Sequence, residues 1–118
     1  MKVQNYKSVQ NWFIKAKGGR GYAPSTERNY IGRMEIFCKL TGKTPDMLAL
    51  ADMGKMRDII AVGLRVQYHR SIRSVSQWIN TLNSFWKYNG RQLEGKYYGI
   101  REHLRKDIIR LKRWMPDS

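Results

Sequence analysis

The chain has 118 residues, with 23 Lys and Arg against 9 Asp and Glu, which gives a net charge of +14 at pH 7. This length suits one domain with a single core, and the sequence shows neither an apolar run long enough for a bilayer nor a signal peptide. The lone Cys38 excludes an intramolecular disulfide, and with only His69 and His103 beside it no zinc site can be assembled. We therefore expect a cytoplasmic protein with no metal, no other cofactor and no membrane partner.

Two helices are predicted in the first part of the chain. The first runs from about Ser8 to Lys17 and ends at Gly18-Gly19. The second runs from Thr26 to Thr41, with Ser25 as its N-cap and Gly42 as its end. Cys38 falls on the apolar face of this helix with Tyr30, Met34 and Phe37, which predicts a buried thiol.

A third helix follows a short turn at Pro45-Asp46. Asp52 is expected to cap it, and the helix continues to about Tyr68. Its expected inward residues are Met56, Ile59, Ile60 and Leu64. Gly54 and Gly63 each weaken it by about 1 kcal/mol if they lie in its interior.

The fourth predicted helix has two contrasting faces. Ser74 to Gln77 fits a capping box, and the helix continues to Asn89 with Gly90 after it. Spacing at 100° per residue gathers Val75, Trp78, Ile79, Leu82 and Trp86 on an inward stripe. The opposite stripe consists of Arg73, Gln77, Asn80, Ser84 and Lys87, all of them hydrogen-bond donors and none of them acidic. Such a face suits a polyanion with readable edges, whereas an ordinary solvated helix face mixes Glu with Lys.

The positive charge is clustered along the chain, since no acid precedes Glu27 and none lies between Asp58 and Glu94. One basic surface attracts phosphates and gains by releasing counterions from nucleic acid. The alternatives are a merely basic soluble protein and an anionic membrane surface. Trp12, Trp78 and Trp86 fall on inward stripes, which favours core positions over stacking on bases.

The chain ends with a polar linker, about Arg91 to Gly99, and a fifth amphipathic helix from Ile100 to Trp114, which Pro116 ends. No run alternates for long enough to form a strand. The sequence thus predicts an all-α fold, a compact four-helix bundle over residues 1–90, with the linker and an additional C-terminal helix over residues 91–118.

Three stretches resemble a known family in their order and spacing: SVQNWF, PSTERNYIGRMEIFCKLTGKTPDML and SVSQWINTLNSFWKYNG. Together they are similar to the N-terminal core-binding, SAM-like domain of tyrosine recombinases and phage integrases, over about residues 8 to 90. FCKLTGKTPDML is most similar to archaeal integrase-type members. The resemblance implies a four-helix clamp that grips one side of duplex DNA for integration or recombination, with its second and fourth helices at the major groove.

The resemblance also implies which residues contact DNA. Family roles fall on Ser25, Thr26, Arg28, Asn29 and Arg33 of the second helix, and on Arg73, Gln77, Asn80, Thr81 and Ser84 of the fourth. Lys15, Lys17, Arg20, Arg70 and Lys87 complete the expected DNA-binding set, the first three in a loop region suited to phosphates. Two alternatives stay open: Ser25 is only a cap, and Arg33 shares a solvated mixed-charge face with Glu35.

Catalysis is not expected from this chain. Full recombinases continue into a catalytic domain with a His-x-x-Arg pair and a Tyr nucleophile, but His69 is followed directly by Arg70, and Lys106 stands where His103 would need Arg. The Gly-rich Gly18 to Gly21 lacks the strand and the Lys-Ser/Thr of a phosphate-binding loop.

The sequence therefore predicts a non-catalytic DNA-binding domain of a tyrosine-type recombinase, located at the nucleoid. Its partners would be double-stranded DNA and other recombinase protomers on that DNA. A free-standing DNA-binding accessory or regulatory protein is the first alternative. A helical protein-interaction or RNA-binding module is the second.

Overall fold

The computed structural model describes residues 2–93, and this part of the chain contains helices and no strand. A short 3-10 helix, η1 (Val3–Asn5), precedes α1 (Lys7–Gly19), α2 (Pro24–Thr41), α3 (Pro45–Leu50), α4 (Met53–Val66) and α5 (Ile72–Tyr88). The all-α bundle expected from the sequence is confirmed. The helix expected over residues 100–114 and most of the linker lie outside the described residues.

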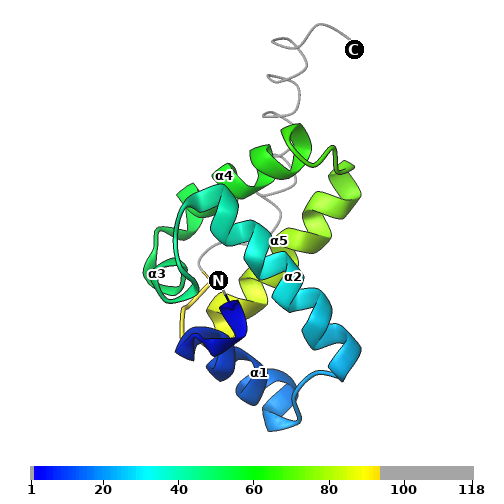
Figure 1. Ribbon diagram of the computed structural model, residues 1–118. Coiled ribbons are helices and arrows are strands. Elements are labelled where there is room, and N and C mark those ends of the chain that lie inside the picture. Colours follow the sequence, from blue (N-terminus) through cyan, green and yellow to red (C-terminus); the bar gives the residue numbers. More distant parts are fainter. Residues whose placement is uncertain (1, 94–118) are drawn as a thin grey trace, which may run out of the picture.

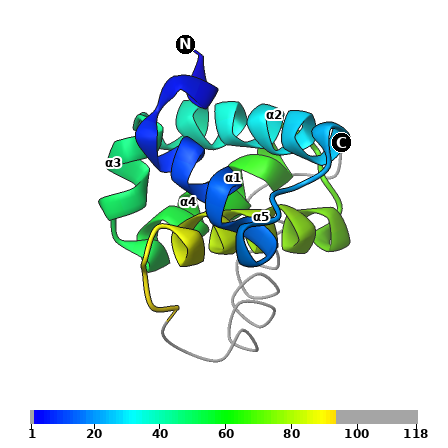
Figure 2. The same ribbon diagram turned by 90° about the horizontal axis from the view of Figure 1, so that it is seen from below.

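The helices pack in two crossing layers (Figure 1). α2 crosses α5 in this view, and Figure 2 shows the same two helices as separate layers of the bundle. α1 packs against α5 and α3, while α4 packs against both α2 and α5. α5 packs against α1, α2 and α4 and also contacts α3 through Trp86 and Leu48, which leaves one side of it exposed.

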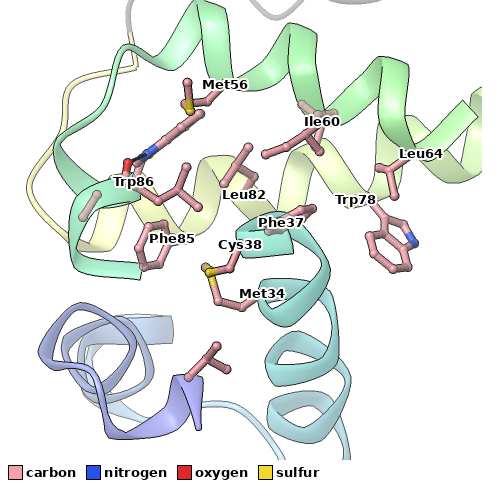
Figure 3. Close-up of a cluster of buried hydrophobic side chains, with 14 of the residues drawn as sticks. Met34, Phe37, Cys38, Met56, Ile60, Leu64, Trp78, Leu82, Phe85 and Trp86 are labelled. Atoms are coloured by element: carbon pink, nitrogen blue, oxygen red, sulfur yellow. Dashed lines mark hydrogen bonds between the residues drawn. The ribbon is translucent and has the colours of Figure 1, made fainter. Parts of the chain in front are cut away.

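The core forms where these helices meet (Figure 3). Its largest fully buried side chains are Trp12, Trp86, Phe37, Phe85, Met34, Leu48, Ile60, Leu64, Ile79 and Leu82. The predicted inward stripe of α5 is buried throughout, and all three Trp expected in the core lie there. Phe85, which that prediction omitted, joins the stripe one turn before Asn89.

Two predicted helix starts are wrong. α2 begins at Pro24, preceded by Ala23 without a side-chain cap, so Ser25 is not the N-cap. Proline suits the first helical position because that backbone nitrogen has no partner in any case. α5 begins at Ile72, and the Ser71 hydroxyl accepts a hydrogen bond from the Ser74 amide (3.2 Å), so the capping box expected at Ser74 does not form.

The segment between α2 and α5 is more helical than expected. Thr44 caps α3 where a turn was predicted, and Asp52 caps α4 as predicted through the Lys55 amide (3.0 Å). α4 ends at Val66 rather than near Tyr68. Ile59 is 43% exposed instead of inward, since the neighbouring Ile60 takes the core position and the helix turns 100° between them.

Gly63 lies inside α4 because α2 approaches closely there. A Cβ atom at this position would overlap the Leu40 side chain of α2, with Cδ1 and Cγ at 3.0 and 3.1 Å. Glycine is a poor helix former, but the absence of a side chain at Gly63 allows α2 and α4 to pack closely. Gly42, by contrast, ends α2 in the left-handed conformation (φ 69°), as the sequence predicted.

Side chains tie the end of the described chain to its beginning. The side-chain amide of Asn89 donates to the Ser8 carbonyl (3.0 Å), and the Trp86 indole donates to the Leu48 carbonyl (2.9 Å). Arg91 donates to the carbonyls of Ala49 and Ala51 (2.9 and 2.8 Å). These bonds fix the C-terminal end of α5 against α1 and α3.

Cys38 is a free thiol, 3% exposed, as predicted. Burial raises the pKa of this thiol to about 11. Within residues 2–93, no helix combines the length and hydropathy that a membrane span requires.

Candidate nucleic-acid interface

The exposed side of α5 carries the residues predicted for it. Arg73, Gln77, Asn80 and Lys87 are exposed, and Ser84 is half-buried. We call these five residues the α5 outer strip. No acidic residue occurs in α5, and the Ser84 hydroxyl donates to the Asn80 carbonyl (3.1 Å). The strip therefore offers amide, guanidinium and ammonium donors, with no carboxylate on its own helix to neutralise them.

Two arginines from different segments meet at Trp78, on the border between the strip and the core. The Arg33 guanidinium carbon, from α2, lies 5.2 Å from the centre of the Trp78 ring. The Arg70 guanidinium carbon, from the segment before α5, lies 5.0 Å from it. We call Arg33, Arg70 and Trp78 the guanidinium cluster. In Figure 3, Trp78 lies at the edge of the labelled core residues, where cations can reach it.

Arg33 is held in place within this cluster. Its Nη1 donates to the Thr81 hydroxyl (2.6 Å), and its guanidinium also lies 5.8 Å from the centre of the Tyr30 ring. Burial lowers the pKa of Arg33, and the positive charge of Arg70 lowers it further, against an opposing effect of Tyr30. The side chain stays protonated at neutral pH because a free guanidinium loses its proton only above about pH 12.

Thr81 does not lie on the outer face as predicted. It is 3% exposed, and its hydroxyl both accepts from Arg33 and donates to the Gln77 carbonyl (3.2 Å). The crossing of α2 over α5 covers it, so Thr81 positions Arg33 instead of presenting a group to a ligand. The family resemblance had placed Thr81 on the outer face, but the sequence could not show which helix covers that flank of α5.

The other end of the α5 outer strip meets the loop between α1 and α2. Helical geometry ends at Ala16 (ψ 143°), before the Gly18-Gly19 stop that was predicted, and Lys17 adopts a left-handed conformation (φ 52°). The Lys17 amide donates to the Tyr88 hydroxyl (3.4 Å), and its Nζ lies 5.8 Å from the Tyr22 ring centre. Lys17 is thereby placed next to the end of the strip.

Tyr22 and Tyr88 contact Lys17 at the end of the α5 outer strip, and the sequence analysis missed both. Trp12 Nε1 donates to the Tyr22 hydroxyl (3.2 Å), and burial raises the pKa of that hydroxyl. Tyr88 stands one turn after Ser84 on the same side of α5, and this i, i+4 spacing was the available signal.

The remaining predicted residues are spread more widely. Lys15 on α1 and Arg20 in the loop are exposed, as are Ser25, Arg28 and Asn29 at the start of α2, while Thr26 is half-buried. Glu35 lies about 160° around the α2 axis from Arg33, so the two do not share a face as the alternative for Arg33 assumed. The structure thus brings Arg33 to α5 and leaves the first turn of α2 as a separate exposed group.

The histidines and acidic residues within residues 2–93 do not form a second candidate site. His69 is exposed in the turn before α5 with a left-handed backbone (φ 53°), and His103 lies outside the described residues. In the same part of the chain, no three His, Cys, Asp or Glu side chains come together as metal ligands would.

Comparison of the chain with protein-family models, with curated proteins and with solved structures found no match. The resemblance to tyrosine recombinases stays a prediction from the sequence.

Proposed function

We propose that the chain binds duplex DNA through the α5 outer strip and the guanidinium cluster, as the non-catalytic core-binding domain of a tyrosine-type recombinase or integrase. The observation that carries the proposal is the exposed, acid-free row of donors on α5. The recombinase assignment rests in addition on the sequence resemblance over residues 8–90. Binding beside other protomers on DNA and a nucleoid location follow from that assignment.

The dimensions of α5 fit a DNA groove. From Arg73 to Lys87 the outer strip is about 21 Å long at a rise of 1.5 Å per residue, which matches about six base pairs. The major groove is about 12 Å wide and admits one α-helix. A helix that enters the groove with its N-terminal half would place those residues against base edges and its C-terminal end against phosphates.

The side chains of the strip divide naturally between these two targets. Gln77 and Asn80 carry amides that can pair with adenine, and Arg73 carries a guanidinium that can pair with guanine. Lys87, at the C-terminal end of the strip, and Lys17, in the adjacent loop, carry compact positive charges suited to phosphates.

The protein-interaction and RNA-binding alternatives predict other surfaces. A protein-binding helix would expose apolar anchors, whereas none of the five residues of the α5 outer strip is apolar. An A-form RNA helix has a deep, narrow major groove that side chains cannot read. A free-standing DNA-binding accessory protein would use the same surface, so it stays open beside the recombinase domain.

Fluorescence anisotropy with a labelled duplex, measured across salt concentrations, tests the proposal. We expect log K to fall against log salt with a slope of about −4 to −6, as for roughly 4 to 7 neutralised phosphates. Lys87→Ala should weaken binding and reduce the slope by about 1. Lys55→Ala is the matched control, because Lys55 faces away from α5. It lies about 160° around α4 from Arg57, and Arg57 contacts Asn83 of α5.

A slope near zero, or equal losses for Lys87→Ala and Lys55→Ala, would contradict the proposal. A hairpin RNA that competes better than duplex DNA would favour the RNA-binding alternative. Once selection from random duplexes has given a preferred site, Gln77→Ala should reduce discrimination against scrambled DNA by about 1 to 3 kcal/mol. Lys17→Ala should weaken both duplexes alike.

A further inference from the structure

The guanidinium cluster gathers two positive charges, and among the described residues no carboxylate is seen to act on Arg33. The influences on the pKa of Arg33 come from burial, Tyr30 and Arg70, and no acid is among them. Both guanidinium carbons lie within 5.2 Å of the centre of one indole ring. The positive charge of Arg70 lowers the pKa of Arg33, so the two guanidinium groups repel each other, and an anion is the group that would complete the arrangement.

We propose that Arg33, Arg70 and Trp78 form a seat for a single phosphodiester group of the DNA backbone. The inference rests on the proposed function and goes beyond it, because it assigns one phosphate to two arginines from different parts of the fold. Guanidinium groups suit this ligand, since their planar fork can donate two parallel hydrogen bonds to phosphate oxygens.

The two arginines are held differently. Arg33 is half-buried and donates one N–H to Thr81, which leaves its other N–H groups available to a ligand. The side chain of Arg70 is exposed, but its backbone is fixed: its amide donates to the Leu64 carbonyl (3.0 Å), and its carbonyl accepts from Arg65 Nη1 (2.7 Å). Arg33 therefore supplies a rigid half of the seat, and Arg70 can close over the phosphate.

A phosphate in this seat would set the register of the protein on DNA. Arg33 belongs to α2, whereas Arg70 immediately precedes Ser71, the N-cap of α5. Backbone contacts of this kind position a protein, while base contacts specify the sequence. One phosphate held from both sides would thus fix how α5 enters the groove.

A double-mutant cycle with Arg33→Lys and Arg70→Lys tests the seat by duplex anisotropy. Each change keeps the charge but loses the fork, so each should weaken binding about three- to tenfold, with the salt slope changed by less than about 1. If both arginines hold one phosphate, the two losses of affinity should not multiply. The loss of affinity in the double variant should be smaller than the product of the two single losses by a factor of at least about three.

The control cycle pairs Arg33→Lys with Lys87→Gln, at the opposite end of α5, where the two losses should multiply. Thermal melts of every variant separate weakened binding from weakened folding. Multiplicative losses for Arg33 and Arg70, or no loss from either Lys substitution, would overturn the seat while a steep wild-type salt slope upholds DNA binding. A flat wild-type slope would overturn both.

Discussion

Replacing Trp78 with alanine should remove much of the stability of the domain. The indole is 7% exposed and packs edge-on against Phe37 at 5.9 Å between ring centres. Truncating a buried Trp to Ala costs about 3 to 5 kcal/mol. A domain of this size has a total free energy of unfolding of about 5 to 15 kcal/mol. At roughly 4 to 8 °C per kcal/mol, the melting temperature should fall by at least about 12 °C.

Gln77→Ala is the matched control, because Gln77 is the preceding residue of the same helix and is exposed. Its effect on the free energy of unfolding should stay within about 0.5 kcal/mol. Urea titrations followed by circular dichroism at 222 nm measure both variants. If Gln77→Ala proves the more harmful change, the inner and outer sides of α5 are reversed, and the proposed interface fails with them.

Three further predictions test other parts of the structure. Gly63→Ala should destabilise the fold by about 1 to 3 kcal/mol through overpacking, whereas Gly32→Ala, with nothing within 4 Å of its Cβ, should stabilise it by about 0.5 to 1 kcal/mol; equal effects in thermal melts would refute the close helix contact. Ser71→Ala should cost about 1 kcal/mol and Ser74→Ala much less; the reverse order in urea titrations would restore the capping box. Because the folded-state pKa of Cys38 is raised to about 11, its contribution to stability is full below about pH 9 and is lost as pH rises toward 11; comparing pH series of wild type and Cys38→Ala should show this loss in the wild type alone.

The helix pattern of this chain was readable from the sequence where one face is uniformly apolar. α5 is the clearest case, since its inward stripe repeats at helical spacing for about three turns, and every residue of it is buried. Helix starts were less readable. The sequence analysis placed the cap of α5 at Ser74, and the structure places it three residues earlier, at Ser71.

The candidate site was only partly readable for a different reason. The α5 outer strip belongs to one helix, so periodicity alone placed it. The guanidinium cluster depends on α2 crossing α5, a tertiary arrangement that brings Arg33 to within 2.6 Å of Thr81, 48 residues away in the sequence. Residues on the flanks of a helix, such as Thr81 and Ile59, are covered or exposed according to the neighbour, and local pattern contains no information about that neighbour.

The bonds between the two ends of the described chain have a consequence for folding order. The Asn89–Ser8 and Lys17–Tyr88 hydrogen bonds join residues 81 and 71 positions apart. Closing such long loops costs chain entropy before any contact compensates for it. α4 and α5, adjacent in sequence, can form a hairpin early, whereas α1 must wait for the completed end of α5. We therefore expect α1 to dock last in folding and to detach first in native-state hydrogen exchange, carrying the lysine-bearing loop away from α5 while the rest of the bundle stays folded.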